Sequence, residues 1–117
     1  MSASRQWRSN WPSSRRRAVA VGGSVGRIAA LDNFCWPDPV QSERTPDGHH
    51  KLAQLVRACR GLQDACLVFD LPLISGKDSM KNDSTRGGVK ISIPPTLLVS
   101  VIGTMDDVSR AQTLDAK

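Results

Sequence analysis

The feature that most constrains the fold is an apolar repeat at helical spacing within residues 49–70. Its members recur three and four positions apart, which predicts one stripe along an α-helix: Leu52, Leu55, Val56, Cys59, Leu62, Cys66 and Phe69. Lys51 lies off this stripe, and Pro72 prevents the helix from continuing. Gly61 weakens a helix by about 1 kcal/mol relative to alanine, so we expect close packing at that point.

Short apolar segments flank this helix on both sides. Residues 18–21 read as the end of an earlier helix, and the glycines of 22–26 predict a turn. Strands are then predicted at 27–31 and 71–75. A helix between two such strands is typical of a β-α-β unit, so we expect an α/β fold with a mixed sheet.

The remaining segments are a further strand region and its connections. Residues 89–103 begin with β alternation, break at Pro94-Pro95, and resume as a buried strand over 96–103. Polar and proline-rich composition predicts loops at 32–48 and 76–88. The last residues read as a turn and a connecting tail.

The net charge of +5 is concentrated at one end of the chain. Residues 1–17 contain five arginines and no acid, whereas residues 18–117 contain eleven basic and eleven acidic residues. The net charge of zero over residues 18–117 argues against a nucleic-acid-binding surface, which requires a basic face. No apolar run approaches the roughly 20 residues of a membrane helix.

Cysteine and histidine usage indicates neither a disulfide framework nor a metal site. Cys35, Cys59 and Cys66 form an odd, sparse set, which favours a reducing, cytoplasmic environment. Cys59 and Cys66 are seven residues apart on one helix face, and we expect both to be small buried residues. His49 and His50 lack spaced metal-ligand partners and mark the entrance of the helix.

The stretch "LISGKDSMKND", residues 73–83, resembles a phosphate-binding loop only in part. A Walker loop needs an earlier glycine where Leu71 stands and a Ser or Thr where Asp78 stands, followed by a helix, so that motif is excluded. An ordinary polar turn is the simplest interpretation. The residue chemistry nevertheless suits a nucleotide.

Each residue after the apolar strand could contribute to phosphate binding. Gly76 would let backbone amides approach an anion, and Lys77 would neutralise its charge. Asp78 would hold Mg²⁺ directly or through water, with Ser79 adding a hydroxyl group. Asp32 would end the preceding strand beside this loop if the two strands are parallel neighbours.

Three stretches of the chain together resemble phosphoribosylformylglycinamidine synthase, the enzyme of the fourth step of purine biosynthesis. They are "LDNFCWPDPV" (31–40), "LAQLVRACRGLQDACLVFDLPLISGKDSMKND" (52–83) and "KISIPPTLLVSVIGTMDDV" (90–108). The resemblance runs from about Ala18 to Lys117. It implies one piece of the second, aminoimidazole-ribonucleotide-synthetase-like half of the synthetase component.

The resemblance also implies a reaction and its partners. The family converts formylglycinamide ribonucleotide, ATP and glutamine to the amidine, ADP, phosphate and glutamate, using Mg²⁺. By this resemblance Gly76, Lys77, Asp78, Ser79 and Asp32 would lie near nucleotide phosphates, and Asp78 is the candidate metal ligand. The missing partners would be the other synthetase half and a glutaminase domain or subunit. The resemblance supports a cytoplasmic location.

Residues 1–17 depart from the family pattern. A family helix preceding residue 18 carries a Glu and an Asn that bind Mg²⁺ and nucleotide, and the matching positions here are Ser13 and Arg17. Three interpretations of residues 1–17 compete: a disordered basic tail, a transit-type peptide, or an out-of-frame translation. A one-base shift of the codons for residues 11–17 is compatible with the family helix.

Three functions follow, from different classes. The first is an incomplete α/β domain, residues 18–117, of the ATP-dependent ligase, inactive by itself. The second is a non-catalytic module that binds nucleotide weakly. The third is an interaction module that self-associates through exposed strands.

Overall fold

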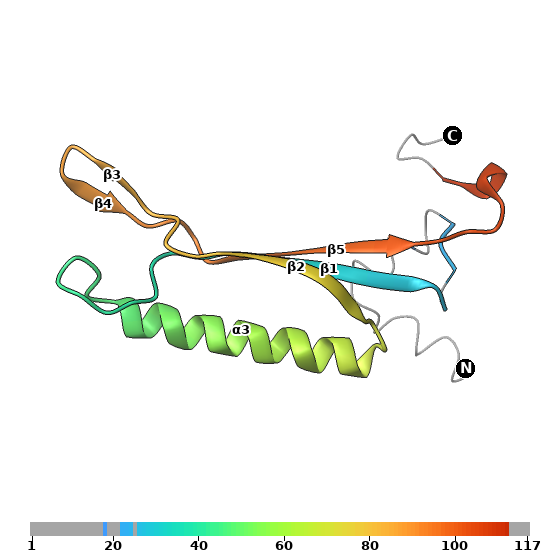
Figure 1. Cartoon of the computed structure of the whole chain (residues 1–117), viewed down its shortest axis with the longest axis horizontal. Helices are drawn as coiled ribbons and strands as arrows, with labels where there is room; N and C mark the ends of the chain where they lie inside the picture. The colour runs from blue at the N-terminus through green and yellow to red at the C-terminus, as the bar shows by residue number, and fades with distance from the viewer. Residues whose placement is uncertain (1–17, 19–21, 25, 113–117) are drawn as a thin grey trace, which may run out of the picture. The chain divides into compact units, whose positions relative to one another are not determined.

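The computed structural model of the protein describes residues 18, 22–24 and 26–112, and residues 1–17 with the positions of Ser13 and Arg17 lie outside these ranges. Along the chain follow strand β1 (Ile28–Cys35), helix α3 (Gly48–Val68), strands β2 (Leu73–Ser79), β3 (Ser84–Arg86), β4 (Val89–Ile91) and β5 (Thr96–Gly103), and the short 3-10 helix η1 (Val108–Arg110) (Figure 1). No helix in the described ranges combines the length and hydropathy that crossing a lipid bilayer requires.

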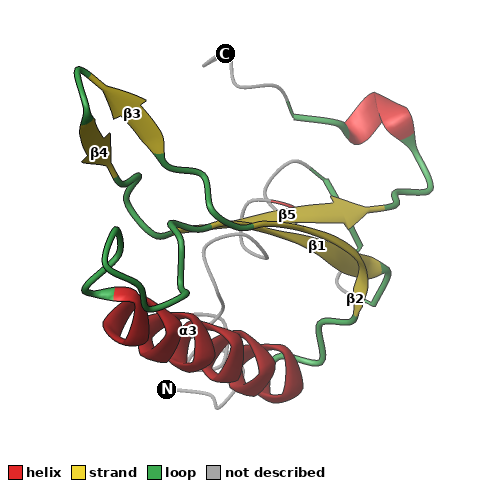
Figure 2. Ribbon diagram, turned by 60° about the vertical axis from the view of Figure 1, so that its left-hand side comes forward, coloured by secondary structure: helices red, strands yellow, loops and turns green. Residues whose placement is uncertain are grey.

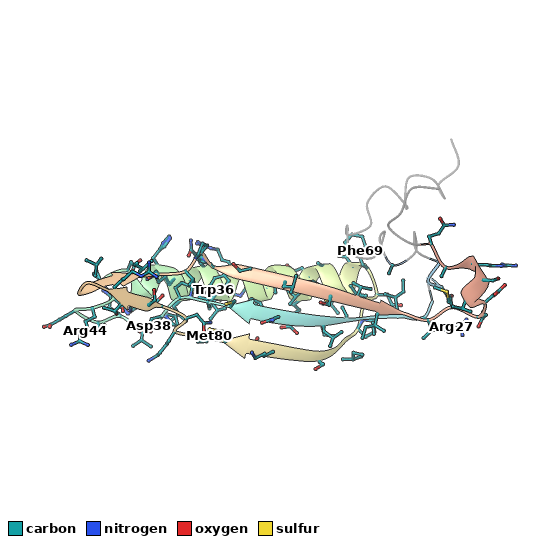
Figure 3. The ribbon with its side chains drawn as sticks, turned by 90° about the horizontal axis from the view of Figure 1, so that it is seen from above. Arg27, Trp36, Asp38, Arg44, Phe69 and Met80 are labelled. Carbon is teal, nitrogen blue, oxygen red and sulfur yellow. The ribbon has the colours of Figure 1, made fainter. Side chains whose placement is uncertain are left out.

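Three strands form one mixed sheet in the order β2-β1-β5 (Figure 2). The arrows of β1 and β2 point the same way in Figure 3, and β5 points the opposite way. Backbone hydrogen bonds follow this pattern, from Ala30 N–H to the Pro72 carbonyl (2.8 Å) and from Trp36 N–H to the Ser79 carbonyl (2.8 Å). The predicted β-α-β unit, with α3 between parallel strands, is therefore confirmed.

The bounds of helix α3 agree closely with the predicted 49–70, and the helix is followed by a residue in the left-handed conformation. Asp70 has φ 47°, and the Leu71 N–H bonds back to the Cys66 carbonyl at 2.9 Å, which closes the last turn before Pro72. The close packing expected at Gly61 is wrong, because a Cβ there would meet no atom within 4 Å. The predicted stripe is only partly covered, since Leu52 and Val56 are 44% and 42% exposed.

Both predicted loops begin later in the structure than in the prediction, because the strand before each loop is longer than predicted. Strand β1 continues through Asp32 to Cys35, and β2 continues through Gly76 to Ser79, because the two strands pair along this polar stretch. The rest of the second loop contains the antiparallel β3–β4 hairpin. Its turn residues Gly87 and Gly88 have φ values of 57° and 78°, as a tight two-residue hairpin requires.

The residues fall into two compact units, each with its own buried centre. The first comprises the described residues up to Leu31 with 65–74 and those from Val99 onward, and its core contains Ile28, Ala30 and Leu71. The second comprises 32–64 and 75–98, and its buried residues include Phe34, Trp36, Pro37 and Thr45. All five predicted site residues belong to the second unit.

Candidate functional site

Asp32 and Gly76 are neighbours across the parallel strands β1 and β2. A Cβ built on Gly76 would lie 2.5 Å from Asp32 Oδ1 and 3.2 Å from Oδ2. The Asp32 carboxylate therefore occupies the space that any other side chain at position 76 would fill. The sequence predicted that Asp32 would lie beside this segment, but Asp32 stands within β1 and does not end the strand.

Strand geometry separates the five predicted residues onto two faces. Successive side chains of a strand alternate, so Asp78 shares the face of Gly76 and Asp32, whereas Lys77 and Ser79 point to the other face. Asp78 and Lys77 are exposed, and Asp32 is half-buried. The structure thus places Asp32 beside Gly76, with Asp78 two residues further along the same face of β2 and Lys77 on the opposite face.

The Asp32–Gly76–Asp78 face has the composition of a partial magnesium–phosphate site. Mg²⁺ is usually held by one or two carboxylates together with phosphate oxygens and water. The missing side chain at Gly76 lets the Asp32 carboxylate lie close against strand β2. Within the part of the chain that the structure describes, no three His, Cys, Asp or Glu side chains gather into a metal-binding group.

The Ser79 hydroxyl is already engaged within the protein. It donates to Asn82 Oδ1 at 3.0 Å, and Asn82 Nδ2 lies 2.7 Å from Ser79 Oγ and 2.8 Å from the Ser79 carbonyl oxygen. The Ser79 hydroxyl group thus has its proton directed to Asn82, and its predicted contact with a nucleotide would use the remaining acceptor position. Trp36 and Met80, labelled in Figure 3, lie in this region, where β1 and β2 end.

A second cluster follows in the same unit, centred on Lys90. The Lys90 ammonium group lies 3.1 Å from Asp83 Oδ2 and 3.6 Å from Asp38 Oδ2, and it donates to Thr45 Oγ1 at 2.6 Å. Asp83 Oδ2 also accepts the Asp38 backbone N–H at 3.1 Å. These contacts join strand β4 to the connection between β1 and α3.

The charges of this cluster shift the pKa values of its acids. Burial by itself raises the pKa of Asp83, but hydrogen bonds from Lys90 and the Asp38 amide lower it below 3.8 overall. The pKa of Asp38 is also lowered, chiefly by the Val40 N–H. Both aspartates are therefore ionised at neutral pH, and both lie within ion-pair distance of the single ammonium group of Lys90.

Lys51 has a similar role at the start of α3. Its ammonium group lies 2.9 Å from Asp47 Oδ1 and donates to Ser92 Oγ at 2.8 Å, and its side chain is only 9% exposed. The Trp36 indole N–H donates to the Lys51 carbonyl at 3.0 Å. The sequence analysis placed Lys51 off the apolar stripe and gave it no partner, although Asp47 stands four residues earlier. It missed the contacts of Lys51 with Ser92 and of Lys90 with Asp38 and Thr45 because they join segments far apart in the sequence.

The chain is similar over most of its length to one segment of a much longer protein. It is 39% identical over 102 residues to phosphoribosylformylglycinamidine synthase subunit PurL from Erythrobacter litoralis, which covers 87% of this chain and 12% of the relative. The same subunit from Synechococcus is 33% identical over 88 residues, covering 74% and 11%. That from Gloeobacter violaceus is 32% identical over 95 residues, covering 81% and 11%.

These matches confirm the resemblance found in the sequence and define its extent. The chain spans about one-eighth of the length of these relatives. No protein-family model matches the chain. No solved structure matches it significantly.

Proposed function

Because the chain is related to one segment of phosphoribosylformylglycinamidine synthase, we propose that it is a partial synthetase domain that contributes one side of a magnesium–nucleotide site. The observation that carries this proposal is the Asp32 carboxylate standing over Gly76. Asp32 lies on the central strand of the described sheet, where its carboxylate oxygens are of the kind that Mg²⁺ prefers as ligands.

Asp32, Gly76 and Asp78 would each have a different role in binding the magnesium nucleotide. Asp32 and Asp78 would hold a Mg²⁺ ion, whose charge would offset that of the nucleotide phosphates. Gly76 would give the Asp32 carboxylate the space that it occupies beside β2. When bound, the metal nucleotide would supply the phosphoryl group of an ATP-dependent C–N ligase. Lys77 is on the other face and would reach a phosphate only around the exposed edge of β2.

The site as proposed is only one part of a catalytic centre. We propose that the chain alone does not form the amidine, because the family's substrate and ammonia sites would come from the other synthetase half and from a glutaminase partner. A coupled assay for ADP release with formylglycinamide ribonucleotide and either glutamine or ammonia tests this. We expect no substrate-dependent ADP, and a steady release would contradict the proposal.

Binding by the isolated chain is the direct test of the nucleotide site. Calorimetric titration with ATP in the presence of Mg²⁺ should give measurable heat, and the affinity should fall when Mg²⁺ is replaced by a chelator. Binding that is the same with and without Mg²⁺ would remove the metal role of Asp32 and Asp78. An absence of binding under both conditions would refute the nucleotide site in this chain.

The exposed apolar residues favour a second candidate function, that of an interaction module. Strands β2 and β5 are the outer strands of the described sheet, and Ile74 and Ile102 on them are 62% and 51% exposed. Outer strands with exposed apolar side chains are prone to pair with another chain. Light scattering that rises with protein concentration would support self-association, and a monomer mass at all concentrations would oppose it.

A further inference from the structure

Asn82 connects the ends of strands β1 and β2 through both its backbone and its side chain. Its backbone N–H donates to the Trp36 carbonyl at 3.1 Å, next to the bond from the Trp36 N–H to the Ser79 carbonyl. Its side-chain amide donates to that same Ser79 carbonyl at 2.8 Å and lies 3.5 Å from the Cys35 sulfur. One residue thus contacts the last residues of both strands.

We propose that Asn82 is a positioning residue for the Asp32–Gly76–Asp78 face. This inference rests on the proposed function, because it names what keeps the two halves of that site in register. The face depends on Asp32 and Gly76 staying opposite one another across parallel strands. Strand β2 is an outer strand, paired with β1 on one side only, so its polar half requires an additional constraint.

The turn around Asn82 is built to hold this geometry. Lys81 adopts φ 60°, a left-handed conformation that costs energy for a residue with a side chain. The contacts of Asn82 hold one end of this turn, and at its other end the Asp83 carboxylate accepts the Asp38 backbone N–H. Second-layer contacts of this kind typically change site affinity about 10–100-fold when removed.

The test uses Asn82→Ala and Asn82→Asp, with Lys90→Met as the matched control. Asn82→Asp keeps an acceptor for the Ser79 hydroxyl but loses the side-chain donor to the Ser79 carbonyl. Lys90→Met removes the neighbouring ion pairs and leaves every contact of Asn82 intact. Both Asn82 variants should weaken MgATP binding about tenfold, whereas Lys90→Met should leave the affinity of the folded protein within about twofold.

Amide hydrogen exchange supplies a measurement that does not depend on nucleotide. The Trp36 N–H should exchange faster in both Asn82 variants than in Lys90→Met, compared at equal global stability. Unchanged Trp36 exchange would overturn the inference. Faster exchange with unaltered MgATP affinity would also overturn it, since Asn82 would then only stabilise the fold. If the unmodified chain binds no MgATP, the proposed function fails, and the positioning role fails with it whatever the exchange shows.

Discussion

Lys90 and Asp83 form a charge pair in which the acid is almost fully buried. Their atoms Nζ and Oδ2 are 3.1 Å apart, and the side chain of Asp83 is 7% exposed, against 27% for that of Lys90. Asp83 Oδ1 is buried and makes no hydrogen bond with the described residues. Removing the lysine would leave an uncompensated buried carboxylate, which is far more costly than the loss of a surface ion pair.

Lys90→Met should therefore lower the free energy of unfolding by roughly 2–3 kcal/mol, less than a fully buried pair because Lys90 keeps contact with solvent. Urea denaturation at pH 7 measures this. The matched control is Lys77→Met, an exposed lysine on β2 that should change stability by no more than about 0.5 kcal/mol. Equal effects of the two substitutions would contradict the role given to Lys90.

The same cluster predicts how stability depends on pH. Asp83 and Asp38 have folded pKa values below 3.8, so their contribution is present above that value and is lost as the pH falls through the folded pKa values. The free energy of unfolding should decrease below about pH 4. The decrease should be smaller in Lys90→Met, which has no ammonium group to hold the Asp83 pKa down. Parallel acid profiles for the two proteins would disprove this account.

Gly76→Ala tests the contact between the strands. The new Cβ would meet Asp32 Oδ1 at 2.5 Å, so the carboxylate must move, but it is the free end of a side chain and can do so at small cost. We expect a change in stability below about 1 kcal/mol with a clear loss of MgATP affinity. The double variant Asp32→Asn/Gly76→Ala should bind MgATP no more weakly than the single variant Asp32→Asn, because both substitutions act on the same carboxylate. An unchanged affinity in Gly76→Ala would contradict the site.

Gly61→Ala should stabilise the protein, contrary to what the sequence suggested. Gly61 lies inside α3 with open space around it, so alanine gains helix propensity of about 0.5–1 kcal/mol without a clash. Gly87→Ala is the matched control, because its surroundings are equally open but its φ is 57°. That substitution should destabilise the hairpin by about 1–2 kcal/mol. In thermal unfolding, the Tm should therefore rise for Gly61→Ala and fall for Gly87→Ala.

The sequence predicted elements well where periodicity or proline determines them. The helical repeat and Pro72 defined α3 to within two residues, and the apolar run after Pro94-Pro95 defined β5 at its observed bounds. It failed at Asp32 and at 76–79, where polar residues suggested loops but pairing with a neighbouring strand extends β1 and β2. Propensity describes one segment at a time, whereas this pairing is a property of two segments.

The sequence predicted the nearness of two candidate site residues but not the arrangement of all five. The nearness of Asp32 and Gly76 followed from the β-α-β order. The separation of Lys77 from Asp78 did not, because a loop interpretation carries no alternation of faces. The engagement of Ser79 by Asn82 depends on a left-handed residue, Lys81, that nothing in the sequence indicates.

The most direct test of the central claim is a calorimetric comparison of MgATP binding to the unmodified chain, to Asp32→Asn and to Lys77→Met. The claim places the metal and phosphates on the face of Asp32, Gly76 and Asp78. Asp32→Asn should therefore weaken binding about tenfold or more, and Lys77→Met should weaken it far less. Binding that is insensitive to Asp32→Asn but abolished by Lys77→Met would place the nucleotide on the other face and contradict the claim.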